Sequence, residues 1–227
     1  MSKKRGSYSS PLQQKRRQRI LREARLQLET HDFSALTMQN IADTSEVSLK
    51  TLYNLLGSRD SLLLEAGLDL LDYLEHSPPI VIAAPCIERL LAYTEQAMKG
   101  FKATPRYARA VITLLLQAEG DNAAARSQLG RIQQFALACL TDAARQGEIR
   151  SDLDLEKFSQ MIAANQWGAT LMWEKGLTPL EELLEQTRLG HYLVLAPIAR
   201  GKTKKALEAQ LHLLRGQHAG ELAPVEA

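Results

Sequence analysis

The chain has 227 residues, of which 45% are apolar, 5% are aromatic and 24% are charged, and its net charge is +2. This length allows one large domain, or a small domain and a larger one. No run of about 18 apolar residues occurs, which argues against a membrane span and a secretory signal, so we expect a cytoplasmic protein with no membrane partner.

Apolar residues recur at the spacing of a helix, Ala and Leu are common, and Val and Ile are sparse, which together predict an all-α fold. The two cysteines, Cys86 and Cys139, stand far apart and have no neighbouring cysteine or histidine pair. This spacing favours two buried thiols over a disulfide or a metal site. We expect neither a metal nor a cofactor.

Residues 1–11 are polar, basic and rich in turn-forming residues, which predicts a disordered basic arm. A helix over residues 12–30 should follow, because apolar residues repeat along it at helical spacing. These are Ile20, Leu21, Ala24 and Leu28. The basic residues around the rest of this helix would also suit a helix lying on a membrane surface, but the apolar face is narrow and holds no Trp or Phe.

Residues 37–60 contain two short segments of helical period separated by five residues, Thr44 to Ser48. Thr37 and Ser48 are suitable N-caps for the two helices, because each hydroxyl can accept a backbone N–H within the next turn. Two short amphipathic helices joined by so tight a turn form a helix-turn-helix. Residues 12–58 are therefore expected to form a three-helix, N-terminal helix-turn-helix domain.

The same run resembles the DNA-binding segment of the tetracycline-repressor-like (TetR) family of transcription regulators. The matching residues are Thr37, Ile41-Ala42, Val47-Ser48, Thr51-Leu52-Tyr53, Ser58-Arg59-Asp60 and Leu62. Two positions depart from the family pattern: Glu46 stands where the family has a turn glycine, and Leu56 where it has a closing Phe. Glu46 should then adopt a positive φ at a cost of about 1 kcal/mol.

The resemblance implies that the second helix of the pair reads DNA. The residues expected at base edges are Leu49, Lys50, Thr51 and Asn54, whose groups suit thymine methyls and the donors and acceptors of the major groove. The residues expected at phosphates are Thr37, Ser48, Tyr53, Arg59, Arg16 and Arg19. Thr51 packing the turn instead remains an alternative, and we expect the Tyr53 ring to be buried with its hydroxyl outward.

The charge distribution agrees with this location for DNA contacts. The first sixty residues carry eleven basic and six acidic groups, a net +5, whereas the remaining residues carry seventeen basic and twenty acidic groups, a net −3. The basic excess thus coincides with the helix-turn-helix, where phosphates would need neutralising. The arm over residues 1–11 would lie along the DNA backbone or enter a minor groove, and the alternative is a solvated tail without a role.

Beyond the helix-turn-helix we expect a larger helical domain over residues 59–200, which binds an effector and dimerises. It should begin with a connecting helix at 59–76, and a proline-rich boundary follows it, since three prolines in ten residues stop a helix. Five more helices are expected at 85–102, 105–119, 122–146, 153–175 and 178–200, which makes about nine in all. Residues 201–227 are expected to be a flexible tail.

Two sets of residues in this larger domain have expected roles. The apolar and aromatic residues expected to line an effector pocket are Met98, Phe101, Tyr107, Phe135, Met161 and Trp167. In the family, the last two long helices of two subunits form the dimer interface, which implies a role there for Leu171, Met172, Leu184, Leu189 and Leu193. For individual residues of both sets, a place in the core of one subunit is an equal alternative.

The sequence therefore indicates a homodimeric, sequence-specific DNA-binding regulator, a repressor that leaves a palindromic operator when a small apolar or aromatic effector binds. The first alternative is a DNA-binding protein without an effector, acting architecturally or under a protein partner. The second is a helical enzyme, against which stand the absence of a G-x-S-x-G, H-E-x-x-H or Gly-rich phosphate motif and the scattered positions of the five histidines.

Overall fold

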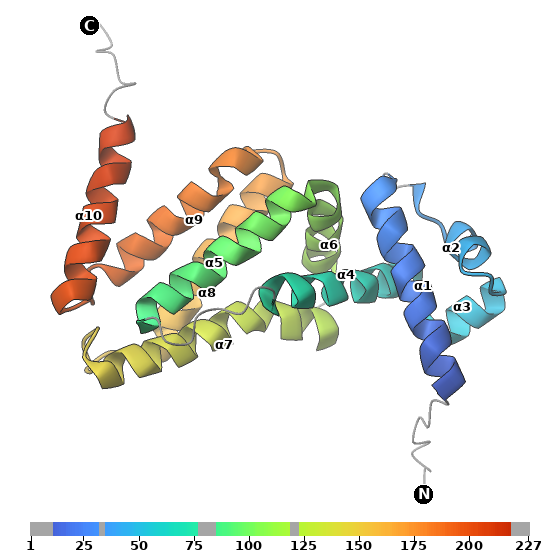
Figure 1. The fold of residues 1–227 in the computed structure, drawn as a ribbon, viewed down its shortest axis with the longest axis horizontal. Helices are drawn as coiled ribbons and strands as arrows, with labels where there is room; N and C mark the ends of the chain where they lie inside the picture. Colours follow the sequence, from blue (N-terminus) through green and yellow to red (C-terminus); the bar gives the residue numbers. More distant parts are fainter. Residues whose placement is uncertain (1–10, 32–34, 77–84, 119–122, 219–227) are drawn as a thin grey trace, which may run out of the picture. The chain divides into compact units, whose positions relative to one another are not determined.

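The computed structural model describes residues 11–31, 35–76, 85–118 and 123–218, so residues 1–10 of the basic arm expected over 1–11 lie outside the described residues, and Pro11 begins the first helix. Ten helices make up this part of the chain (Figure 1). They are α1 (Pro11–Thr30), α2 (Met38–Thr44), α3 (Leu49–Leu56), α4 (Arg59–His76), α5 (Cys86–Ala103), α6 (Pro105–Gln117), α7 (Ala123–Gln146), α8 (Leu155–Glu174), α9 (Leu180–Leu195) and α10 (Gly201–His218). The predicted all-α fold is confirmed.

The helices group into two compact units. The first comprises Met1–Asp72 and Thr104–Ala118, and the second comprises Tyr73–Ala103 and Glu119–Ala227. The first unit is larger than the domain expected over residues 12–58, because it also takes in most of α4 and all of α6. The difference arises because α4 and α6, which are far apart in the sequence, pack against each other.

The contact between α4 and α6 is close and specific. The Tyr107 hydroxyl on α6 donates to the Ala66 carbonyl on α4 at 2.7 Å, and both residues are buried. A Cβ placed on Gly67 would lie 2.5 Å from Cγ2 of Val111, so only a glycine lets the two helices approach so closely at this position. These contacts fasten α4 to α6 within the first unit.

The helix starts follow the predicted capping. The Thr37 hydroxyl accepts the Asn40 N–H at 3.1 Å at the start of α2, and the Ser48 hydroxyl accepts the Thr51 N–H at 3.1 Å at the start of α3. Both predicted N-caps are confirmed, and each satisfies a backbone donor that has no partner within its helix.

In the turn between α2 and α3, Glu46 adopts the left-handed conformation and ends α2. Its φ is +52°, as predicted, and it is the only non-glycine with a positive φ in the described residues. The Val47 N–H bonds the Ala42 carbonyl at 3.0 Å and the Glu46 N–H bonds the Asp43 carbonyl at 3.2 Å, the pairing of a Schellman motif. A glutamate thus occupies a conformation that glycine adopts at lower cost.

In the second unit, α5, α7, α8 and α9 lie side by side around a shared apolar core (Figure 1). The buried residues of this core include Leu90, Leu140, Ile162 and Leu195. Two aromatic pairs also stack in this unit: the ring centroids are 4.4 Å apart in Tyr93–Phe135 and 5.6 Å apart in Phe101–Trp173. Within the described ranges, no helix has the length and apolarity that crossing a bilayer requires.

Residues 201–218 form α10, so the flexible tail expected over residues 201–227 is wrong in this part. Leu207 is buried, and Leu211 and Leu214 are packed against the core, at the i, i+4, i+7 spacing of one helix face. The segment before α10 is held by an antiparallel bridge between Ile149 and Ala199. The segment begins with the polar run Gly-Lys-Thr-Lys-Lys. The flexible tail was expected from this run, and the apolar spacing that follows it was not used.

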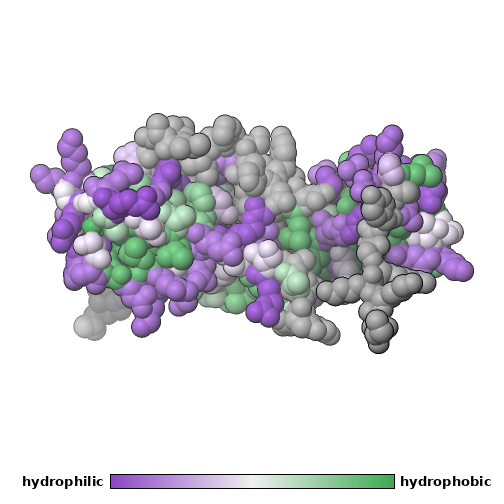
Figure 2. Space-filling view, turned by 90° about the horizontal axis from the view of Figure 1, so that it is seen from below, coloured by the Kyte–Doolittle hydropathy of each residue, from purple (hydrophilic) through white to green (hydrophobic). Residues whose placement is uncertain are grey.

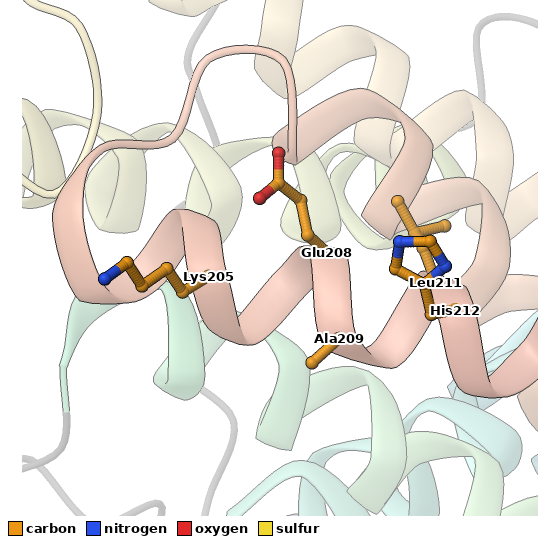
Figure 3. Close-up of a pocket in the computed structure, with 5 residues that line it drawn as sticks. All are labelled: Lys205, Glu208, Ala209, Leu211 and His212. Carbon is orange, nitrogen blue, oxygen red and sulfur yellow. The ribbon is translucent and has the colours of Figure 1, made fainter.

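A surface hollow of about 590 Å³ lies along α10 (Figure 3). Its lining includes Lys205, Glu208, Ala209, Leu211 and His212, whose side chains leave a single helix. The hollow is shallow, because the residues that line it come from one helix. Its polar groups are one carboxylate, one ammonium group and one imidazole. Among the described residues, no group of three or more Asp, Glu, His or Cys side chains is placed to hold a metal.

Candidate nucleic-acid interface

The outer face of α3 presents Leu49, Lys50, Tyr53 and Asn54 to solvent. The opposite face carries Leu52 and Leu56, which are buried at 0% and 5% exposure. Tyr53 is 51% exposed, so the expectation that its ring is buried is wrong. One residue in an α-helix turns the side chain by about 100°, and Tyr53 follows the fully buried Leu52, so its ring points away from the core.

Ser48 and Thr51 interact with each other at the start of α3. The two hydroxyl oxygens are 2.8 Å apart, and the Ser48 oxygen also receives the Thr51 N–H. Thr51 is half-buried. Its hydroxyl therefore takes part in closing the turn, which is the alternative that the sequence left open.

The basic residues around the helix pair differ in their present contacts. Arg16 is exposed. Arg19 lies 3.4 Å from the Glu46 carboxylate, and this carboxylate is 81% exposed, so the pair is a weak surface contact. The Arg59 side chain donates to the Leu36 carbonyl and lies 3.0 Å from Asp60, so part of its hydrogen-bonding capacity serves to hold the segment before α2.

Arg17 is a basic residue that sequence reasoning left without a role. Its Nε donates to Glu65 Oε1 at 2.9 Å, its Nη2 donates to the other oxygen of the same carboxylate, and its Nη1 donates to the Leu55 carbonyl at 2.5 Å. One guanidinium thus joins α1, α3 and α4. Its partners are 48 and 38 residues away in the sequence, so no local pattern reveals the arrangement.

The residues expected to line an effector pocket do not form one group. Phe135 and Trp167 pack together against the small cluster that contains Tyr93, and Trp167 Nε1 donates to the Leu129 carbonyl at 3.1 Å. Met98 and Phe101, both on α5, are buried in the same second unit.

The other two expected pocket residues lie elsewhere. Tyr107 belongs to the first unit, where its ring is buried and its hydroxyl bonds α4. Met161 is 51% exposed, because it lies on the solvent side of α8, next to the fully buried Ile162.

A buried polar trio connects α5, α8 and α9. The Thr94 hydroxyl lies 3.3 Å from Gln166 Oε1 and 3.4 Å from His191 Nδ1, and all three side chains are at most 3% exposed. His191 Nε2 lies 3.3 Å from the Ile162 carbonyl, so Nε2 carries the hydrogen and Nδ1 accepts. Burial lowers the pKa of His191 to about 4, against an opposing effect of this carbonyl, so the imidazole is neutral near pH 7.

Both cysteines are free and buried, as predicted. Burial is the main cause that raises the pKa of Cys139 to about 11, and it also raises the pKa of Cys86. Because the thiolate is the reactive form, both thiols are unreactive near neutral pH. The Cys86 N–H donates to Glu148 at 2.8 Å, so this position serves the start of α5.

Apolar side chains reach solvent on α8 and α9, where the resemblance implies an interface between subunits. Leu171 is 38% exposed, Met172 41% and Leu193 54%, while Leu184 and Leu189 are half-buried. Figure 2 shows one face of the molecule, on which apolar side chains come to the surface at several places among hydrophilic ones. Leu171 and Met172 lie in the last turn of α8, and Leu193 lies near the end of α9, so each helix has large apolar groups at its surface.

Comparison with known proteins shows which of them share this fold. No family model and no curated protein match this chain, but solved structures do. FadR from Thermus thermophilus, a TetR-family transcriptional repressor in complex with lauroyl-CoA, is 23% identical and superimposes with a TM-score of 0.67 over 82% of this chain and 96% of its own. The chain has the TetR-like fold.

Two further structures share the TetR-like fold. TylP, a TetR regulator from Streptomyces fradiae, is 19% identical, with a TM-score of 0.62 over 92% of this chain and 99% of its own. A TetR transcriptional regulator from Rhodococcus sp. RHA1 is 17% identical, with a TM-score of 0.62 over 81% of this chain and 96% of its own. The proteins named in these structures are transcriptional regulators rather than enzymes.

Proposed function

We propose that this protein is a homodimeric, sequence-specific DNA-binding transcription regulator that acts as a repressor. The observation that carries the proposal is the outer face of α3: Lys50, Tyr53 and Asn54 are exposed on a short helix that Leu52 and Leu56 anchor and a Schellman turn positions. A helix held this way, within a TetR-like fold, suits the major groove of DNA.

Roles for individual residues follow from their chemistry and exposure. Lys50 would donate to guanine O6 and N7, Asn54 would pair with adenine, and the exposed Leu49 and the Thr51 methyl would pack thymine methyls. Thr37 and Ser48 at the helix starts, the Tyr53 hydroxyl, and Arg16, Arg19 and Arg59 would bind phosphates. Glu46, an acid within this surface, would oppose binding and pair with Arg19 until a phosphate replaces it.

A homodimer is part of the proposal for two reasons. One helix-turn-helix makes too few contacts for tight specific binding, whereas a dimer reads two half-sites about one helical turn apart. The exposed Leu171, Met172 and Leu193 supply an apolar surface on α8 and α9 that a second copy would bury, with Leu184 and Leu189 beside it.

A small-molecule effector completes the proposal. The aromatic and apolar side chains of α5, α7 and α8, among them Met98, Phe101, Phe135 and Trp167, suit an apolar or aromatic ligand. Structures with this fold include one in complex with lauroyl-CoA and one named a gamma-butyrolactone receptor, with a TM-score of 0.57. Binding between the helices of the second unit would release the operator.

The experiment that tests the proposal is selection of bound sequences from a random DNA pool at about 150 mM salt with the purified full-length protein. We expect enrichment of an inverted repeat whose half-sites match the spacing of a dimer. Recovery of unrelated sequences with strongly salt-dependent affinity would contradict sequence-specific regulation and favour an architectural DNA-binding protein.

A further inference from the structure

The guanidinium of Arg17 connects the outer, DNA-facing helix α3 to α4. It binds both oxygens of the Glu65 carboxylate on α4, in the bidentate geometry that arginine forms and lysine does not. The remaining terminal nitrogen donates to the Leu55 carbonyl in the last turn of α3. The side chains of Arg17 and Glu65 are 39% and 35% exposed, so both are partly buried.

The end of α3 depends on this contact. A helix of eight residues is too short to persist on its own, and the carbonyls of its last turn have no intrahelical donor. The Gly57 N–H satisfies the Tyr53 carbonyl at 3.0 Å, while the Leu55 carbonyl bonds Arg17. A cation at this end also complements the negative end of the helix dipole. Arg17 therefore fixes the C-terminal end of α3, as the Ser48 cap fixes its start.

The other partner of Arg17 lies in a fixed stretch of α4. The residues after Glu65 are the two that α6 holds: Ala66 through the Tyr107 hydroxyl, and Gly67 through close packing against Val111. The Glu65 carboxylate thus projects from a point of α4 whose position α6 determines. Rigid contacts then run from α6 through α4 and Arg17 to the C-terminal end of α3, all inside the first compact unit.

We propose that Arg17 and Glu65 are positioning residues for DNA binding: their pair sets the placement of α3 relative to α4 without either side chain touching DNA. The inference rests on the proposed DNA-binding function and adds a mechanism to it. A shift of α4 would pull the Arg17 guanidinium away from the Leu55 carbonyl, and Lys50, Tyr53 and Asn54 would move with the helix.

The test compares four variants with the wild type on the selected operator: R17M, E65Q, the charge-swapped R17E/E65R, and K99M as a control that removes an exposed cation from α5. Affinity is measured from 100 to 300 mM salt, urea denaturation gives stability, and hydrogen exchange without DNA follows the α3 amides. R17M should weaken DNA binding about tenfold and E65Q several-fold, because charge-assisted hydrogen bonds are lost. Neither should change the slope of log affinity against log salt, and K99M should match the wild type.

The charge swap separates positioning from simple stability. R17E/E65R restores an ion pair between α1 and α4, but a glutamate at position 17 cannot donate to the Leu55 carbonyl. We expect its stability to recover toward the wild type, its DNA affinity to stay about tenfold low, and the amides at the end of α3 to exchange faster than in the wild type.

Three outcomes would overturn the positioning role. Tighter binding by E65Q, or a salt slope that falls by about one in R17M, would make Arg17 a phosphate contact. Wild-type affinity in the charge swap would leave only a stabilising ion pair. A wild-type protein that selects no sequence would refute the proposed function and the positioning role together, whereas specific wild-type binding with unaffected variants would refute the positioning role alone.

Discussion

Lowering the pH from 7.5 to 5 should destabilise the second compact unit through His191. This imidazole is fully buried on α9, and burial lowers its pKa to about 4, while the Ile162 carbonyl opposes this shift and no charged neighbour contributes. The ordinary pKa of a histidine is about 6.5. Between pH 6.5 and 4 the unfolded chain therefore binds a proton at this residue that the folded chain does not.

The size of the effect follows from the two pKa values. The free energy of unfolding changes with pH in proportion to the difference in bound protons, so stability falls as the pH falls. The loss from His191 is about 2 kcal/mol at pH 5 and approaches about 3 kcal/mol at pH 4. Above pH 7 the residue is neutral in both states and contributes no dependence.

The assay is urea denaturation followed by tryptophan fluorescence at pH 7.5, 6 and 5, at one protein concentration because a dimer is expected. The wild type is compared with H191Q, which cannot titrate but keeps an amide that can bond the Ile162 carbonyl, and with H212Q, which removes an exposed histidine of α10. H191Q should lose about 2 kcal/mol less than the wild type between pH 7.5 and 5, while H212Q should follow the wild type. Equal losses in all three proteins would refute the reasoning.

Three further predictions concern the turn, the core and the subunit interface. E46G should raise the free energy of unfolding by about 0.5–1 kcal/mol in thermal denaturation, because glycine adopts the left-handed conformation without strain. The greater entropy of glycine in the unfolded chain offsets part of this gain, and a decrease would show that the Glu46 side chain stabilises the turn. G190A should lower the free energy of unfolding by about 1–3 kcal/mol, because the new Cβ would lie 1.9 Å from Oδ1 of Asn165, whose amide donates to the Thr187 carbonyl. The control G168A, where no atom lies within 4 Å of the new Cβ, should be neutral or stabilising, and equal effects of the two changes would contradict the packing. L193E should yield a monomer in light scattering and L213E should remain a dimer, and a dimeric L193E would move the interface away from α9.

Much of the helix-turn-helix could be predicted because its determinants are local. The capping hydroxyls of Thr37 and Ser48 bond amides three residues later. The positive φ of Glu46 was expected from the resemblance, because Glu46 stands where the family has a turn glycine. The exposed ring of Tyr53 could have been predicted in the same way, since it directly follows a core leucine. The expectation of a buried ring gave the apolar character of tyrosine more weight than its outward place on the helix face.

The remaining parts depend on contacts between residues far apart in the chain. The membership of α6 in the first unit rests on Tyr107 and Gly67, whose partners lie about forty residues away. The same holds for the polar trio, because Thr94 and His191 are 97 residues apart. In the sequence, Thr94, Gln166 and His191 lie singly within amphipathic helices, where polar residues are ordinarily read as exposed.

The two ends of α3 should therefore differ in what disturbs them. The start is held by Ser48, which belongs to the same turn, so its contribution persists wherever α4 lies. The end is held by Arg17, whose guanidinium also binds Glu65 on α4, so this contact survives only while α1, α3 and α4 keep their present arrangement. A movement of α4 would then tilt α3 about its fixed start and displace Asn54 more than Leu49. Under the proposed function, contacts from the end of the helix should be lost first when the protein leaves its operator.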